Sequence, residues 1–411
     1  MTGAEPGGET PHFVATRAEA LDRLAAFLPR AGQAYARDRN TDGGPDRARS
    51  VSALSPYLRY RLLTEREVIA SALDRHGPEA ADKFVSEVLW RTYFKGWLEL
   101  HPAAWDRFLA ERDAARQAMG RSGGLARAVA AAEEGRTGIA GFDDWARELA
   151  AFGYLHNHAR MWFASIWIFT LRLPWTLGAD FFLRHLVDAD PASNTLSWRW
   201  VAGLQTPGKT YLATADNIAR HTGGRFAPQG LAREAPAIEE APLPGLRSLP
   251  ARPAALPGPA LLLLHPEDFG PESFAPGGLS VAGVAVAERG SGDWPWGEAA
   301  RAFVATAAAD AAARAGQAFD CAATVTQGLD AATVLAAAAE AGAAWVLVPE
   351  APVGPVAEAL AALSDPLAAA GLPLVRLRRP WDDALWPLAT KGFFPFRQRS
   401  RAVLEADGMR S

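Results

Sequence analysis

The sequence predicts an α plus α/β fold, in which an all-helical first part is followed by a smaller part built on a parallel sheet. Three observations support this prediction. Apolar residues recur at helical spacing through residues 16–225, with no alternating strand pattern. Residues 226–260 are rich in proline, lack periodicity and read as a linker. In residues 261–400 short apolar runs alternate with alanine-rich helical segments, as expected for parallel strands covered by helices.

The composition is that of a globular protein long enough for two domains. Of the 411 residues, 49% are hydrophobic and 21% are charged. The apolar stretch near Trp162–Phe169 is interrupted by Arg172, and no segment approaches the roughly 20 apolar residues that cross a membrane. The chain starts without the basic and apolar segments of a secretory signal. We therefore expect a cytoplasmic protein without a membrane partner.

Cysteine and charge narrow the possible functions further. The single Cys321 allows no internal disulfide and no cysteine metal site, as expected in a reducing compartment, and no metal site is predicted. The net charge is −4, and residues 1–240 hold equal numbers of basic and acidic side chains. If either part binds nucleic acid, we expect it to be the first, through arginines clustered on one face.

Helices of the first part can be placed from spacing and caps. The lead, residues 1–15, is expected to be disordered. Thr16 is expected to cap a helical segment that runs to about Arg39. Ser50–Leu58 introduces another helix, where serines and backbone N–H groups suit either ordinary capping or a phosphate. Further helices are expected at Glu65–His76, Asp82–Leu100, Trp105–Ala131 and Phe142–Phe152.

The second part, residues 261–400, reads as a Rossmann-like α/β domain. Its expected strands are Leu261–Leu264, Val281–Val286, Ala322–Val325, Trp345–Val348 and Leu374–Leu377. Its expected helices include Ala299–Ala315, Ala331–Ala341 and Val356–Ala370. No glycine-rich dinucleotide fingerprint or P-loop follows these strands, so a standard nucleotide site is not predicted there.

The stretch from Gly153 to Gly203 is unusual because charged residues lie among five tryptophans. Its polar residues include His156, Asn157, Arg160, Asp188, Asp190 and Asn194. Arginine and aspartate are rarely fully buried unless they are paired. The pattern indicates a buried polar site, and the alternative is a helical domain that holds only structural ion pairs.

The order of motifs resembles the FAD-binding domain of the DNA photolyase and cryptochrome family. The motifs are Tyr35-x-x-x-Arg39, Ser52-x-Leu54-Ser55, Glu87-x-x-Trp90-Arg91, Thr137-Gly138, His156-Asn157-x-x-Arg160-Met161, and Asp188-x-Asp190-x-x-x-Asn194 followed by Trp198-x-Trp200. The resemblance covers roughly residues 16–225. It implies that a U-folded FAD is bound by Tyr35, Ser52, Leu54, Ser55, Arg91, Asn157, Arg160, Asp188, Asp190 and Asn194.

The chemistry of these residue types agrees with that implication. Serine hydroxyls and backbone N–H groups suit the pyrophosphate. Arg160 and Asp188 can pair beside the flavin ring so that neither charge is buried alone. Asn194 would face the flavin N5, where a neutral amide can accept or donate a hydrogen bond.

A second set of residues concerns the substrate. In family members that repair cyclobutane dimers, positions matching Glu87, Trp90, Asn157, Met161 and Trp200 form a cavity. The resemblance implies that two tryptophan faces take a flipped pyrimidine dimer by stacking, worth ~1–3 kcal/mol per base. Met161 would supply an apolar wall, and Glu87 would hydrogen-bond the bases. The alternative is that both tryptophans pack in the core.

Some positions depart from the family pattern. Val51 stands where a threonine is usual, and Arg59–Arg61 stands where His-Phe-Gly is common. Trp175 and Trp198 match the two inner members of an electron-transfer tryptophan chain, while the outer position falls near Ser122. Residues that could take the outer place are Trp105, Trp145, Trp162 and Trp167.

Domain order is the largest departure. Family members usually place an α/β antenna domain before the helical domain, whereas the α/β pattern here follows it. The tail Ala370–Ser400 is similar to the end of that antenna domain, where a last strand leads to a short loop ending in F-x-P-F. A permuted antenna domain is one interpretation, and an unrelated α/β module is the other.

The resemblance implies a flavin-dependent, blue-light-driven enzyme that repairs cyclobutane pyrimidine dimers by electron transfer from reduced FAD. Its partner would be damaged DNA, its working form a monomer and its cofactor FAD. Whether a second antenna chromophore is bound, and which one, is left open by the sequence. A cryptochrome-like photoreceptor without repair activity is the main alternative. A flavoprotein that binds DNA without repairing it is the third.

Overall fold

The computed structural model describes residues 13–44, 50–251, 256–274, 279–290 and 296–409. Most of the lead expected to be disordered, residues 1–15, lies outside the described residues. Parts of the expected loop at 40–49 and of the linker at 226–260 also lie outside them.

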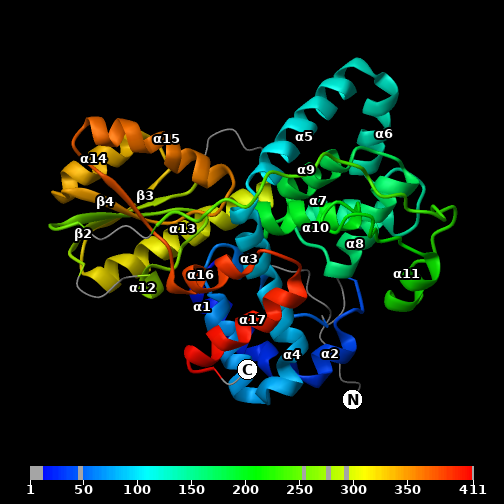
Figure 1. Ribbon diagram of the computed structural model, residues 1–411, viewed down its shortest axis with the longest axis horizontal. Coiled ribbons are helices and arrows are strands. Elements are labelled where there is room, and N and C mark those ends of the chain that lie inside the picture. Colours follow the sequence, from blue (N-terminus) through cyan, green and yellow to red (C-terminus); the bar gives the residue numbers. More distant parts are fainter. Residues whose placement is uncertain (1–12, 45–49, 252–255, 275–278, 291–295, 410–411) are drawn as a thin grey trace, which may run out of the picture.

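Helices build the first part of the chain (Figure 1). They are α1 (Arg17–Phe27), η1 (Leu28–Arg30), α2 (Gln33–Asp38), α3 (Ser55–Arg59), α4 (Glu65–Leu100), α5 (Ala103–Arg121), α6 (Gly123–Glu133), α7 (Phe142–Phe152), α8 (Asn157–Ser165), η2 (Ile166–Thr170), α9 (Trp175–His185), α10 (Pro191–Val201) and α11 (Ala215–His221). Among the described residues no strand precedes Ala260, as predicted.

Local sequence sets several helix ends. Thr16 caps α1 by accepting a hydrogen bond from the Glu19 backbone N–H, as predicted. Thr64 and Glu67 form a reciprocal capping box at the start of α4. The helices predicted on either side of residues 77–81 are joined in α4, but the chain leaves helical geometry at Gly77, where φ is 73° and Pro78 follows.

Five parallel strands form one sheet in the order β3-β2-β1-β4-β5. The strands are β1 (Ala260–Leu264), β2 (Val281–Ala287), β3 (Ala323–Thr326), β4 (Trp345–Pro349) and β5 (Leu374–Leu377), and the helices between them are α12 (Pro271–Phe274), α13 (Glu298–Phe319), α14 (Ala331–Ala341) and α15 (Pro355–Ala369). The predicted strands agree with these bounds to within one residue, and the predicted parallel sheet is confirmed.

The two faces of the sheet belong to different cores. Leu262 and Leu264 lie in a core that continues through α13 into the helical part. Leu261 and Leu263 pack instead with α14 and α15. Alternate side chains of a strand point to opposite faces, so one strand serves both cores. Figure 1 shows α13 on one side of the sheet and α14 and α15 on the other.

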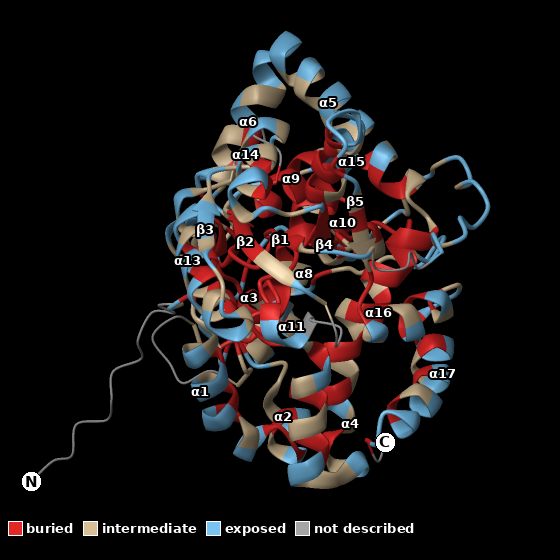
Figure 2. Cartoon of the chain, turned by 90° about the vertical axis from the view of Figure 1, so that its left-hand side faces the viewer, coloured by how far each residue is buried: buried red, intermediate tan, exposed pale blue. Residues whose placement is uncertain are grey.

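After β5 the chain returns to the helical part. Helices α16 (Pro380–Leu385), η3 (Trp386–Leu388) and α17 (Phe393–Ala406) pack against α4. Gly96 permits close approach of η3, because a Cβ there would lie 2.8 Å from Trp386 Cα. The resemblance implies a short loop that leads from the last strand to F-x-P-F, but the structure has α16 and η3 between β5 and that segment. The segment itself begins α17, whose buried residues face α4 (Figure 2).

Buried ion pairs connect the helical part to the sheet part. Arg61 lies 2.6 Å from Asp382 and 3.3 Å from Asp268. Arg379 donates to both oxygens of Asp268 at 2.6 Å. Arg59 pairs with Glu267 at 2.6 Å. The set Arg59, Arg61, Glu267, Asp268, Arg379 and Asp382 is called the buried junction below.

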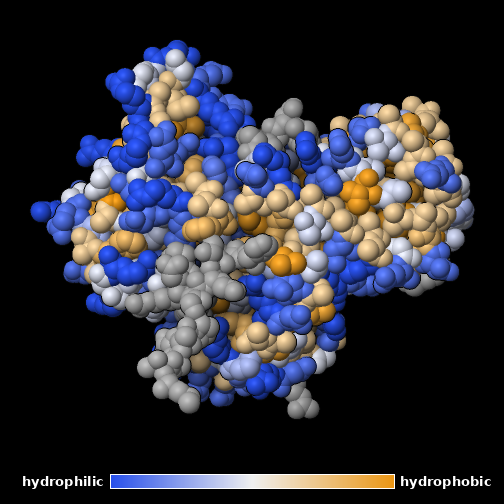
Figure 3. Space-filling model, turned by 180° about the vertical axis from the view of Figure 1, so that it is seen from behind, coloured by the Kyte–Doolittle hydropathy of each residue, from blue (hydrophilic) through white to orange (hydrophobic). Residues whose placement is uncertain are grey.

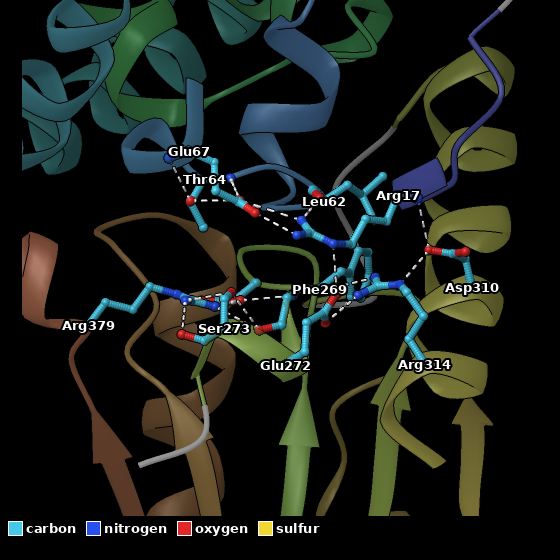
Figure 4. A network of polar contacts seen from close by, with 12 residues as sticks. Arg17, Leu62, Thr64, Glu67, Phe269, Glu272, Ser273, Asp310, Arg314 and Arg379 are labelled. Atoms are coloured by element: carbon cyan, nitrogen blue, oxygen red, sulfur yellow. Dashed lines mark hydrogen bonds and ion pairs between the residues drawn. The ribbon is translucent and has the colours of Figure 1, made fainter. Parts of the chain in front are cut away.

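A more open network lies beside the buried junction (Figure 4). Arg17 pairs with Glu67 at 2.5 Å and with Glu272 at 2.8 Å. Arg314 pairs with Glu272 at 2.5 Å and with Asp310 at 2.8 Å. These contacts join α1 and α4 to α12 and α13.

The outer surface differs between the two parts. Seen from behind, the sheet part presents more apolar residues than the helices farthest from it (Figure 3), and many of its exposed residues belong to alanine-rich segments such as α13. No helix in the described part of the chain is long and apolar enough to cross a membrane.

Candidate functional site

The polar residues of the Gly153–Gly203 stretch lie around the starts of α8 and α10. Gly153 ends α7 with φ of 65°, and a Cβ there would lie 2.7 Å from Val187 Cγ2, so this turn requires glycine. His156 caps α8 by accepting from the His158 N–H. Asp190 caps α10 by accepting from the Ser193 N–H at 2.7 Å.

Arg160 and Asp188 form the predicted ion pair, with Arg160 Nη2 at 2.9 Å from Asp188 Oδ2. Burial alone would raise the pKa of Asp188, but the attraction and hydrogen bond of Arg160 hold that pKa below its ordinary value. The Asp188 side chain is 2% exposed, whereas that of Arg160 is 23% exposed. The arginine therefore connects a buried carboxylate to an accessible space.

Asp190 lies among three cations. Its Oδ2 is 3.3 Å from Lys95 Nζ and 3.4 Å from Arg91 Nη1. Arg59 Nε is 4.0 Å away. Burial opposes ionisation, yet these cations bring the pKa of Asp190 far below its ordinary value. Lys95 also lies 3.4 Å from Glu267, so a single buried lysine connects the candidate site to the buried junction.

Glu87 of α4 lies between Arg39, at the end of α2, and Asn157, at the start of α8. Arg39 donates to Glu87 Oε2 at 2.8 Å, and the Asn157 amide donates to Oε1 at 3.4 Å. The Glu87 side chain is 35% exposed, and the partly open place formed by Glu87, Arg39 and Asn157 is called the recess below. Desolvation raises the pKa of Glu87 despite the opposing effect of Arg39.

The two predicted stacking tryptophans already contact other rings. Trp90 stacks on Phe393 of α17, with centroids 3.8 Å apart and planes 9° apart. Trp200 stacks on Tyr211, with centroids 5.6 Å apart. Both tryptophans and Met161 are nevertheless only partly buried. One face of Trp90 is therefore committed to the protein itself.

The residues predicted to hold phosphate lie before and within α3. Ala53 has φ of 51°, a left-handed conformation that re-aims the backbone N–H groups around it. Ser52 accepts from the Leu54 N–H at 3.4 Å, Leu54 is buried, and Ser55 is only partly buried. Tyr35 is buried in a ring cluster with Phe27 and Phe84.

The predicted electron-transfer residues lie in the aromatic core of α9 and α10. Trp198 meets Trp167 edge-to-face at 6.3 Å, and the space that a Gly178 Cβ would need is taken by the Trp198 ring. Trp175 contacts Phe108 at 5.7 Å. Trp105 also contacts Phe108, with ring centroids 5.3 Å apart, so Phe108 lies between Trp105 and Trp175. Of the candidates for the outer place, Trp167 and Trp105 are therefore the ones next to the predicted pair.

Asn194 is buried, and its amide nitrogen donates to the Ala179 carbonyl at 2.9 Å. This bond fixes the orientation of the side chain and uses one of its two amide hydrogens. The amide oxygen and the second N–H remain to accept from or donate to another group.

The site fits a ligand that carries both hydrogen-bond donors and anionic groups. Arg91 Nη1 is buried and has only the 3.4 Å contact with Asp190, and Asp188 Oδ1 is buried without a hydrogen bond of good geometry among the described residues. Buried polar atoms in this state are costly unless a ligand or water completes them. FAD presents ring N–H groups and a pyrophosphate, so the donor and acceptor set agrees with the cofactor that the motifs imply.

Sequence reasoning missed four residues that the structure adds to the site. Arg39 was included only as part of a motif, and Lys95, Phe393 and Tyr211 were not singled out. Lys95 falls on the buried face of α4 four residues after Arg91, so its helical spacing was a usable signal. Phe393 could not have been found, because nothing in the sequence pairs it with Trp90.

Residues 84–230 match the model of the FAD binding domain of DNA photolyase. The chain is 35% identical to a deoxyribodipyrimidine photo-lyase of Thermus thermophilus over 230 residues, 55% of this chain and 49% of that protein. It is 35% identical to one of Streptomyces griseus over 167 residues, covering 40% and 35%. The resemblance to the family is thus confirmed for this region, and the chain spans about half or less of the length of these relatives.

Solved structures of the same family are also found. A class III photolyase of Agrobacterium tumefaciens is 26% identical, with a TM-score of 0.41 over 52% of this chain and 44% of that chain. A cryptochrome of Synechocystis is 20% identical, with a TM-score of 0.44 over 53% and 45%.

Proposed function

We propose that this protein, with its photolyase-type FAD-binding region, is a flavin-dependent enzyme that repairs cyclobutane pyrimidine dimers in DNA with blue light. The observation that carries the proposal is the recess at Glu87. Asn157 donates a hydrogen bond to Glu87 there, and Trp90 lies one helical turn after Glu87 in α4. Arg160 lies in the first turn of α8, the helix that begins with Asn157. The relatives named deoxyribodipyrimidine photo-lyase support this reaction class.

The proposed cofactor residues bind and orient FAD, which in its reduced form supplies the light-driven electron. These residues are Tyr35, Ser52, Leu54, Ser55, Arg91, Asn157, Arg160, Asp188, Asp190 and Asn194. Arg160 and Arg91 supply positive charge near the recess, while Asp188 and Asp190 keep those cations in place. Trp175 and Trp198 are proposed to pass electrons through the aromatic core for the photoreduction of oxidised FAD.

The proposed substrate residues hold a flipped dimer. Trp200 and the open side of Trp90 stack on the bases, and Met161 excludes water. Glu87 hydrogen-bonds the bases, and desolvation raises the pKa of its carboxyl. Asn157 and Arg39 fix the direction of that carboxyl.

Other parts of the proposal concern partners and location. The substrate is damaged DNA, the working form is a monomer, and the protein works in the cytoplasm. A second antenna chromophore remains a proposal. A neighbour from Sulfolobus tokodaii is described as an archaeal photolyase with two FAD molecules, implying a novel light-harvesting cofactor.

A blue-light photoreceptor is the second candidate, and two observations favour it. Phe393 covers one face of Trp90, which reduces the surface open to a base. Lys95 contacts both Asp190 and Glu267, so a change of charge at the flavin would reach the buried junction. In this reading the state of the flavin shifts the sheet part.

A light-dependent repair assay decides between the two candidates. Single- and double-stranded oligonucleotides that contain a defined cyclobutane dimer are incubated with the purified protein under blue light and in darkness. Repair is expected only in the light, and Glu87→Ala is expected to lower its yield per absorbed photon. A protein that carries FAD but restores no dimer and does not prefer damaged DNA would be the photoreceptor.

A further inference from the structure

Helix α17 presents an aromatic side chain to solvent beside the recess. Phe394 is 81% exposed and is the only aromatic among the large, exposed apolar side chains of the described residues. Its neighbours are fixed, since Phe393 stacks on Trp90 and Phe396 is fully buried. The exposure of Phe394 therefore belongs to an anchored helix start.

The same segment carries basic residues and no acidic ones. Residues 384–404 contain four basic side chains and no aspartate or glutamate, in a chain whose net charge is −4. Arg397 pairs with Asp82 at 3.3 Å. Arg399 donates only to neutral oxygens, including the Leu388 carbonyl at 2.6 Å, and exposed Lys391 has no carboxylate partner among the described residues.

An exposed ring between such cations fits nucleic acid better than a protein partner. Bases stack on aromatic rings regardless of sequence, and phosphates are attracted to unpaired lysine and arginine. The other large exposed apolar residues, Val14, Leu21, Leu246 and Val325, belong to different elements. The apolar surface at α17 is thus one ring wide, much smaller than a protein interface requires.

We propose that the first turn of α17 is a nucleic-acid contact, where Phe394 stacks on a base and Lys391 and Arg399 meet the flanking phosphates. The rings of Trp90, Phe393 and Phe394 form a row, with the last two centroids 6.0 Å apart, so this contact is connected to Trp90 of the proposed substrate set. The inference rests on the proposed function and deepens it. It assigns a DNA contact to a helix outside residues 84–230, the region that matches the family model.

Binding of the full-length protein to a fluorescent, undamaged single-stranded oligonucleotide tests this contact. Phe394→Ala is expected to weaken binding by about 5- to 150-fold at fixed salt, the loss of one stacked base. Lys391→Gln is expected to lower the slope of log affinity against log salt by about 1. Leu246→Ala and Arg301→Gln, which change an exposed apolar residue and an exposed cation elsewhere, are expected to bind as the parent does. Flavin absorbance should be equal in all five proteins.

The outcomes separate this contact from the repair activity. Equal affinities of Phe394→Ala and Leu246→Ala would overturn the contact, even if the parent repairs dimers. A change in oligomeric state of Phe394→Ala with unchanged oligonucleotide affinity would also overturn it, since the ring would then serve a protein interface. Binding that depends on Phe394 in a protein that repairs nothing would support the contact and reject the repair function.

Discussion

The buried junction and the recess at Glu87 are built from the same residue types and differ in how completely they are closed. In the junction the Glu267, Asp268 and Asp382 side chains are at most 3% exposed, and arginines contact each of them. In the recess Arg39 and Glu87 are 32% and 35% exposed. Fully buried arginine–carboxylate contacts indicate a connection between parts of the protein, and partly exposed ones indicate a place that a ligand can reach.

The largest loss of stability is expected from a substitution in the buried junction. Arg61→Ala leaves Asp382 and Asp268 with less compensating charge in a buried position, so the free energy of unfolding should fall by about 3–5 kcal/mol. Chemical denaturation measures this loss. Arg136→Ala, which removes an ion pair with Glu134 whose side chains are 61% and 57% exposed, should cost no more than about 1 kcal/mol. Equal losses in both variants would mean that the junction contributes no more than a surface pair.

Substitutions of the proposed cofactor residues should lower stability less than the Arg61 variant does, and should lower the FAD content of the protein. Arg160→Ala leaves the buried Asp188 without its ion pair, at about 1–3 kcal/mol, and Asn157→Ala removes the donor to Glu87. Both variants should purify with less FAD, which the ratio of flavin to protein absorbance measures. Normal flavin content in both would contradict the assignment of these residues to the cofactor.

The substrate side of the recess should respond without loss of flavin. Trp200→Ala should weaken binding to dimer-containing DNA by ~1–3 kcal/mol, because one stacking surface is lost. Trp90→Ala should do the same and also lose its contact with Phe393, so Trp90→Phe serves as its packing control. Titration at one fixed salt concentration gives both values. If Trp90→Ala and Trp90→Phe bind damaged DNA equally, Trp90 only supports α17.

The smallest effect concerns a second closed contact, at Glu99. Glu99 accepts from the Val353 N–H and pairs with Arg247 at 2.9 Å, and burial raises its pKa to about 7. The folded protein therefore binds this proton more tightly than the unfolded chain. The contribution of this group to the free energy of unfolding should fall as the pH rises from about 4.5 to 7, and level off above that range.

Glu99→Gln should remove that part of the pH dependence, because the amide oxygen still accepts from Val353 and no longer titrates. Glu134→Gln, at an exposed position, is the matched control and should keep it. Denaturant titrations at several pH values between 4.5 and 8 measure both. Parallel pH profiles for parent and Glu99→Gln would place the titration elsewhere.

Local signals made most of the helices and strands predictable from the sequence. Helix α14 begins where Asp330 accepts from the Thr333 N–H and ends at Gly342 in the left-handed region. Aspartate before a helix and glycine after it are the usual residue types at these positions, so both ends can be predicted. The five strands are short apolar runs bounded by turn residues. By contrast, α17 begins after Gly392, which makes no side-chain cap, so its helical form depends on packing of Phe393, Phe396 and Leu404 against the rest of the protein.

The residue types of the candidate site could be predicted from the sequence, but the contacts of these residues with distant parts of the chain could not. The Arg160–Asp188 pair follows from two motifs 28 residues apart. The contact of Lys95 with Glu267 spans 172 residues, and that of Arg61 with Asp382 spans 321, so only the folded chain brings them together. Physical chemistry predicts that a buried charge needs a partner, but it does not identify a distant partner.

The return of the chain to α4 after β5 affects how the protein would respond to a protease. The sheet part is joined to the helical part by the linker at one end and by α16, η3 and α17 at the other. A single cut in the linker would yield two fragments, and the second would still hold α4 through its last helices. The fragments should therefore migrate together under native conditions and separate only in denaturant.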